Sequence, residues 1–148
     1  MSKTISYRGR LPMGLQAKLN LRTIKGKVGY KVSKFQIMSQ TAGSATGTFV
    51  AQIFKKDQTG AVSAVVDFSN PDLVAVVFAN FSSSVNSPTY ETIIFDNEMF
   101  NQNVFVTIQD PDGGTQECNY YVELEAKEIN DLESTMLTLK NIRTITSR

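Results

Sequence analysis

The chain has 148 residues, of which 41% are hydrophobic, 15 are Lys or Arg, 14 are Asp or Glu and none is His. This length and apolar content are typical of one compact domain with a sizeable core. Without histidine and with a single cysteine, the chain alone cannot form a Ser/His/Asp or Cys/His catalytic site, a His-ligated metal centre or an internal disulfide.

The charges are segregated along the chain. Residues 1–56 hold eleven Lys or Arg and no Asp or Glu, whereas residues 57–148 hold four and fourteen. The formal net charge of +1 therefore conceals a basic first third of +11 and an acidic remainder of −10. A subunit with opposite charges in two regions is complementary to copies of itself and to acidic protein surfaces.

Residues 1–27 are predicted to be an extended basic arm rather than part of the body. The segment 11–14 contains Pro12 and Gly14, which interrupt regular structure, and further glycines follow. Its apolar residues are too many for a solvated tail, so they need a surface to contact. We predict that the arm binds a partner through Arg8, Arg10, Leu15, Lys18, Leu19, Leu21, Arg22, Lys25 and Lys27.

From about residue 28 the apolar residues alternate with polar ones, which is typical of β-strands. The apolar parity changes after Val32 and resumes at Phe35, which indicates either a bulge or a strand buried on both faces. Residues 49–56 and 62–68 alternate on either side of the turn 57–60, and this predicts a hairpin.

Four further strands are predicted after this hairpin. The uninterrupted apolar run 73–79 indicates a strand buried on both faces, and residues 90–96, 104–108 and 118–125 complete the set. Residues 97–103 are expected to be a connection that Met99 and Phe100 attach to the body. Residues 110–114 predict a turn, although Asp110 and Asp112 have the spacing that opens a calcium loop.

The sequence thus predicts an all-β fold: an antiparallel β-sandwich, either jelly-roll-like or immunoglobulin-like, over residues 28–130. Residues 131–148 are predicted to be a short C-terminal helix or tail, because apolar residues recur there at helical spacing. Cys118 shares the apolar parity of its strand and is expected to be a buried small hydrophobe. No basic and apolar leader and no membrane-length apolar run is visible, so we expect synthesis in a cytoplasm.

Several segments resemble small virion proteins of marine tailed bacteriophages, including those of cyanobacteria. They are residues 7–15, 24–30, 94–98, 118–125 and 138–145. The resemblance implies a virion location and a non-enzymatic structural role, most often as a capsid cement or decoration protein, without a cofactor. It also implies binding to the major capsid protein, other virion proteins or copies of the chain.

Other roles stay open at this point. A place at the head-to-tail junction or in the tail is the first alternative, and a nucleic-acid-binding or glycan-binding module is the second. Basic segments bind nucleic acid through its phosphates. However, the arm has no dense basic run, and it matches no nucleic-acid-binding motif. No membrane partner is expected.

Overall fold

The computed structural model describes residues 2–21, 28–40, 47–58, 62–81, 89–95, 99–114 and 116–128, together with Met136 and Leu139. These residues form an all-β fold of eight antiparallel strands. The strands are β1 (Ser2–Leu11), β2 (Leu15–Leu19), β3 (Val28–Ser39), β4 (Gly47–Phe54), β5 (Leu73–Phe81), β6 (Thr89–Ile94), β7 (Val104–Gln109) and β8 (Cys118–Glu128).

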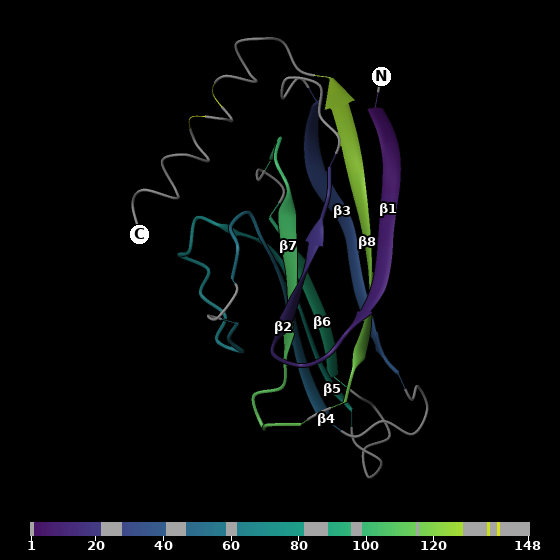
Figure 1. The fold of residues 1–148 in the computed structure, drawn as a ribbon, viewed down its shortest axis with the longest axis vertical. Coiled ribbons are helices and arrows are strands. Elements are labelled where there is room, and N and C mark those ends of the chain that lie inside the picture. Colours follow the sequence, from purple (N-terminus) through teal and green to yellow (C-terminus); the bar gives the residue numbers. More distant parts are fainter. Residues whose placement is uncertain are drawn as a thin grey trace.

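The strands form two sheets that face each other (Figure 1). One sheet has three strands in the order β1-β8-β3, and the other has five in the order β2-β7-β4-β5-β6. Every pairing is antiparallel. The first and last strands of the chain are therefore neighbours, and so are the second strand and the seventh.

The prediction of a separate N-terminal arm is wrong for residues 2–19. All ten residues of β1 pair with β8, and β2 pairs with β7 from Leu15 to Leu19. The Tyr7 hydroxyl also donates to the Asn20 carbonyl oxygen at 3.2 Å, which links the end of β2 to the other sheet. The backbone of these residues is extended, as expected, but it belongs to the body, which begins at Ser2.

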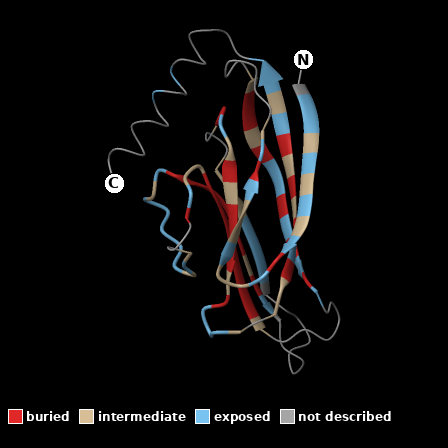
Figure 2. Cartoon of the chain, in the orientation of Figure 1, coloured by how far each residue is buried: buried red, intermediate tan, exposed pale blue. Residues whose placement is uncertain are grey.

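The core lies between the two sheets. Along β3 and β8 buried residues alternate with intermediate or exposed ones (Figure 2). On β8 the inward side chains Cys118, Tyr120, Val122 and Leu124 are all buried, as the alternation predicts. They face side chains of the five-stranded sheet. Other buried residues of this core are Phe35, Ile37, Phe49, Ala51, Ile53, Val77, Val104, Val106 and Ile108.

The bulge predicted in β3 is confirmed. The register against β8 shifts between Val32 and Lys34, so that Val32 and Phe35 both face the core. Ser33 is the additional residue, and its hydroxyl donates to the Glu123 carbonyl oxygen at 3.1 Å. A bulge is the way in which a strand changes the parity of its buried side chains without ending.

In the five-stranded sheet β4 and β5 are buried on both faces, which confirms the prediction for residues 73–79, whereas the edge strands β2 and β6 carry exposed residues. The outward side chains on β4 and its neighbours are also covered: Thr48, Val50, Gln52, Phe54, Val76 and Thr107. Residues 62–72 lie along this face, where the Gln52 amide nitrogen donates to the Ser63 and Val65 carbonyl oxygens. Val65 and Phe68 themselves are exposed.

The predicted hairpin is wrong, because residues 62–70 form no strand and β4 pairs instead with β5 and β7. The alternation of Val62, Ala64, Val66 and Phe68 resembled a strand. In the structure this segment covers the outer face of the sheet rather than extending it.

Two connections between strands have the structure that the sequence predicts. Phe100 is fully buried, and its backbone N–H and carbonyl oxygen both pair with Tyr30, whose ring lies 6.2 Å from its own. In the turn after β7, the Gly113 N–H donates to the Asp110 carbonyl oxygen, and Gly113 has a φ of 83°, which favours glycine.

The predicted helix at 131–148 lies outside the described residues except for Met136 and Leu139, which are exposed. Within the described part of the chain, no helix has both the length and the apolar character needed to cross a membrane.

Candidate partner-binding surface

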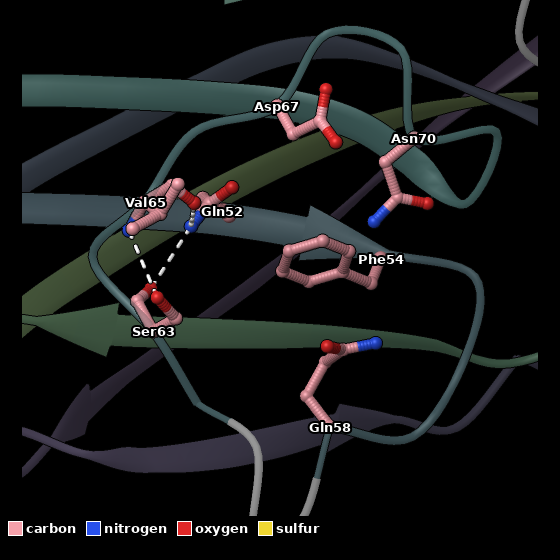
Figure 3. Close-up of a pocket in the computed structure, with 7 residues that line it drawn as sticks. All are labelled: Gln52, Phe54, Gln58, Ser63, Val65, Asp67 and Asn70. Atoms are coloured by element: carbon pink, nitrogen blue, oxygen red, sulfur yellow. Dashed lines mark hydrogen bonds between the residues drawn. The ribbon is translucent and has the colours of Figure 1, made fainter.

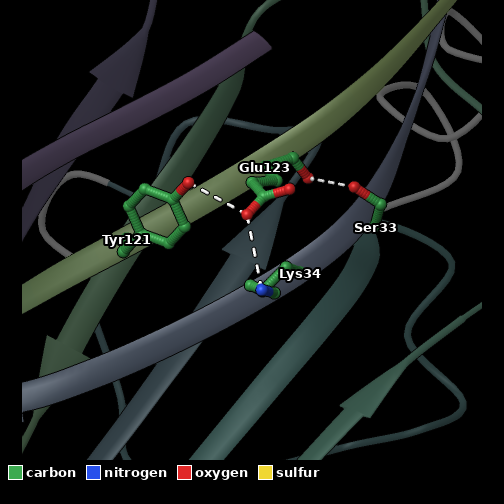
Figure 4. Close-up of polar contacts among 4 residues, drawn as sticks. All are labelled: Ser33, Lys34, Tyr121 and Glu123. Carbon is green, nitrogen blue, oxygen red and sulfur yellow. Dashed lines mark hydrogen bonds and ion pairs between the residues drawn. The ribbon is translucent and has the colours of Figure 1, made fainter. Parts of the chain in front are cut away.

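The outer face of the three-stranded sheet brings the basic and acidic parts of the chain together. β8 lies between β1 and β3, and its outward residues include Glu123 and Glu125. Lys31 is the register partner of Glu125, and Lys34 that of Glu123. The Lys34 Nζ lies 3.5 Å from the Glu123 Oε2, which also accepts a hydrogen bond from the Tyr121 hydroxyl at 2.9 Å (Figure 4).

Part of the charge segregation along the chain is therefore matched within the fold. Arg10, at the end of β1, adds an ion pair of 3.5 Å with Glu117. Cross-strand pairs of opposite charge stabilise a sheet, but exposed pairs contribute little, about 0.2–1 kcal/mol each. Linear charge segregation alone is thus weaker support for intermolecular docking than the sequence suggested.

A different basic surface lies at the end of the sandwich where β2 and β4 end and β7 begins. It is a depression of about 550 Å³, and we call it the lysine depression. Its lining residues are Lys18, Leu21, Lys55, Lys56, Asp57, Asn101, Gln102, Asn103 and Phe105. Three ammonium groups against one carboxylate, with amide side chains around them, are suited to an anionic partner.

Sheet register brings these residues together. Lys18 on β2 pairs with Phe105 on β7, and Phe105 pairs in turn with Phe54, the last residue of β4. The lysines that follow β4 therefore lie two strands away from Lys18. Residues separated by about forty positions in the sequence share this surface because β7 lies between β2 and β4.

Side-chain hydrogen bonds fix the walls of the lysine depression. The Leu21 N–H donates to the Asn103 Oδ1 at 2.8 Å. Gln16 donates through its Nε2 to the Asp57 Oδ1 at 2.6 Å and accepts from the Gln58 N–H at 2.7 Å. The segment after β4 is thus attached to β2, which orders the surface before any partner binds.

The nine residues predicted to bind a partner do not form one surface. Lys18 and Leu21 line the lysine depression. Arg8 and Arg10 are exposed on β1, in the other sheet, and Leu15 is exposed at the start of β2. Leu19 is buried in the chain's own core, so its assignment to a partner contact is wrong.

The remaining three predicted residues, Arg22, Lys25 and Lys27, lie outside the described residues. They follow Leu21 directly in the sequence. Lys55, Lys56 and residues 101–103 were missed as candidates. The sequence shows a Lys-Lys pair at the end of one strand and a run of amide side chains before another. Only the pairing of β4 with β7 shows that these two features lie together.

A second, smaller cavity lies under residues 62–70 (Figure 3). Its volume is about 170 Å³, and it is lined by Gln52, Phe54, Gln58, Ser63, Val65, Asp67 and Asn70. The Ser69 hydroxyl and N–H both donate to Asp67, and these bonds lower the pKa of its carboxyl group. They stabilise the turn within the covering segment, and Gln52 attaches that segment to the sheet.

Cys118 is fully buried, as predicted, and burial raises the pKa of its thiol to about 12. Asp110 is also buried, and its Oδ1 accepts the Asp112 N–H at 2.7 Å, as in an Asx turn. Among the residues that the structure describes, no three Cys, Asp or Glu side chains gather into a metal site.

Comparison with known proteins identifies no relative: no protein-family model matches the chain, and no curated protein has a similar sequence.

Proposed function

We propose that this protein is a non-enzymatic virion structural protein with a jelly-roll sandwich, most simply a capsid cement or decoration protein. The strand order is the observation that carries the proposal. β1 pairs with β8, β2 with β7 and β4 with β5, which is the nested order expected when one long antiparallel hairpin rolls up. Eight-stranded jelly rolls recur in viral capsid proteins.

The fourth nested pair of such a roll would join β3 to β6. Here β6 pairs with β5, but it also lies against β3, where the Ile37 N–H donates to the Tyr90 phenol oxygen at 3.0 Å. This contact is what supports the jelly-roll alternative over the immunoglobulin-like one. A fold does not define a function by itself, so a partner surface is also required.

The lysine depression supplies that surface. A cement protein must hold a neighbouring subunit, and ammonium groups around an apolar floor can bind an acidic segment of it. Phe105 and Leu21 would contribute apolar burial at about 25 cal/mol per Å² before entropic losses. The lysines would orient the approach. Within the same class, a place at the head-to-tail junction or in the tail is the alternative.

Mass spectrometry of purified virions tests the class of protein. We expect this chain in many copies per particle, and its absence from particles would contradict the proposal. Electron microscopy of the same particles then separates the capsid surface from the junction and the tail.

A matched pair of variants tests the surface. Lys18→Glu reverses a charge in the lysine depression, whereas Arg8→Glu makes the same change on the exposed face of β1. We expect Lys18→Glu to reduce the occupancy of the protein on particles and Arg8→Glu to leave it unchanged. Equal effects of both variants would contradict a role for the depression.

Nucleic acid is the other anionic partner that the lysines could bind. In that case the affinity for DNA should fall steeply as the salt concentration rises. Gel retardation at low salt distinguishes the two partners. If the parent protein retards DNA and Lys18→Glu does not, the partner of the lysine depression is nucleic acid rather than a capsid protein.

A further inference from the structure

A third cavity is lined by residues near the end of β3 and the start of β8. These strand ends lie at the opposite end of the molecule from the ends of β2 and β4, which border the lysine depression (Figure 1). The volume of the third cavity is about 350 Å³, within the range of pockets that hold small ligands. Its lining includes Tyr90 and Tyr121, the amides of Gln36 and Asn119, and Met38, whereas the ring of Tyr120, which also borders it, is buried in the core. We call it the tyrosine depression.

The chemistry of the tyrosine depression differs from that of the lysine depression. Of the described residues that line it, none is charged. Tyrosine rings offer flat apolar faces with a polar end, and each side-chain amide offers both donors and an acceptor. A sugar ring has the matching properties, an apolar C–H face and hydroxyl groups that donate and accept. We propose that the tyrosine depression binds an uncharged carbohydrate.

The surface is ordered before a ligand arrives. The Tyr90 phenol oxygen accepts the Ile37 N–H, and the Tyr121 hydroxyl donates to Glu123, which Lys34 also contacts (Figure 4). These partners limit the rotation of both rings, so less conformational entropy is lost on binding. Tyr90 is 43% exposed and Met38 is 60% exposed, so ligand can reach them.

Nucleic acid is the main competitor, because bases also stack on tyrosine. A nucleic-acid strand needs cations beside its phosphates. On this face Lys34 is ion-paired with Glu123 and Arg10 with Glu117. Arg8 is the register partner of Tyr121 on β1 but does not line the depression, and the lining itself provides no ammonium or guanidinium group. The uncharged lining therefore favours a neutral sugar over a nucleotide.

Titration of the ¹⁵N-labelled full chain tests the proposal by NMR. The probes are glucose, galactose, mannose, N-acetylglucosamine and cellobiose at millimolar concentrations. We expect at least one sugar to shift the amide signals of residues 36–38, 90 and 119–121 together. No shift with any of the five sugars, or shifts spread over the whole molecule, would overturn the proposal.

Variants make the test specific. Tyr121→Ala and Asn119→Ala are expected to weaken binding about tenfold, which corresponds to roughly 1.4 kcal/mol. Tyr121→Phe keeps the ring and should bind within a few-fold of the parent, and Lys18→Ala should bind as the parent does. An unchanged ¹⁵N spectrum outside the depression shows that each variant is folded.

Two results would contradict the carbohydrate. One is binding that Tyr121→Ala leaves intact, and the other is tighter binding of uridine monophosphate than of any sugar at the same residues. Neither result depends on the capsid proposal, which concerns the other depression and has its own variant, Lys18→Glu.

Discussion

The outer faces of the two sheets differ in how far their residues are exposed to solvent. On the three-stranded sheet the outer face is polar and charged, and β8 alternates strictly between core and solvent. On the five-stranded sheet β4 is buried over seven consecutive residues, because a covering segment lies on its outer side. The apolar run of β5 thus indicated a covered face correctly, whereas the alternation in residues 49–56 did not reveal that β4 is covered as well.

The charged residues of the two sheets also differ in their arrangement. Lys34 and Glu123 on the open face interact with each other, whereas Lys18, Lys55 and Lys56 gather beside the covered face. The second arrangement places three ammonium groups around one depression.

The largest expected effect comes from the core that both sheets share. Leu124 is fully buried on β8, so Leu124→Ala should lower the free energy of unfolding by about 2–5 kcal/mol, through lost burial and the cavity left behind. Denaturant unfolding measures it. Leu15→Ala is the control, because Leu15 is half exposed, and a loss as large as that of Leu124→Ala would contradict the assignment of the core.

The next effect concerns the inner side of β8 and its dependence on pH. The Cys118 pKa is raised to about 12 in the folded state from an ordinary value of 9.0. Between these values the unfolded chain loses the proton and the folded chain keeps it. Stability should therefore be complete below pH 9 and fall above it by up to about 1.4 kcal/mol per pH unit from this group.

Tyr30 and Tyr120 also have pKa values raised by burial, so they add to the same trend. Comparing the parent with Cys118→Val isolates the thiol. We expect the pH slope of the variant to be shallower between pH 9 and 11, and equal slopes would show that the thiol is not buried.

A smaller effect should appear on the covered face. Gln52 is buried and donates to the Ser63 and Val65 carbonyl oxygens, so Gln52→Leu should cost about 1–2 kcal/mol. It should also expose residues 62–70 to proteolysis. Gln36→Leu, on the open face, is the control and should change neither property.

The smallest effect is expected from the open face. A double-mutant cycle on Lys34→Ala and Glu123→Ala should give a coupling energy of about 0.2–1 kcal/mol, decreasing with salt, because both side chains are partly exposed. A coupling above this range that salt does not reduce would mean that the outer face is covered as well.

The sequence predicted those parts of the fold whose pattern is local. The alternation of β7 and β8, the apolar run of β5 and the parity change in β3 each define an element without knowledge of its neighbours. The role of β1 was not predictable in this way. Its basic residues suggested a solvated arm, and only the partner β8, more than a hundred positions later, makes it a strand of the body.

The same limit applies to the candidate site. Lys18 and Leu21 were predicted from the basic segment, but Lys55 and Lys56 join them only through the register of β2, β7 and β4. The prediction of a strand at residues 62–68 was wrong for the converse reason. Their alternation is local, but no neighbouring strand is available for them, because β4 already pairs on both sides.

Hydrogen–deuterium exchange of the isolated protein tests most directly whether the basic first third is part of the sandwich. We expect the β1 amides that donate to β8 to be protected along with those of β8 and β3, since these strands form one sheet. Exchange of every β1 amide at the rate of an unstructured chain, while β8 and β3 stay protected, would contradict the structure and restore the separate arm.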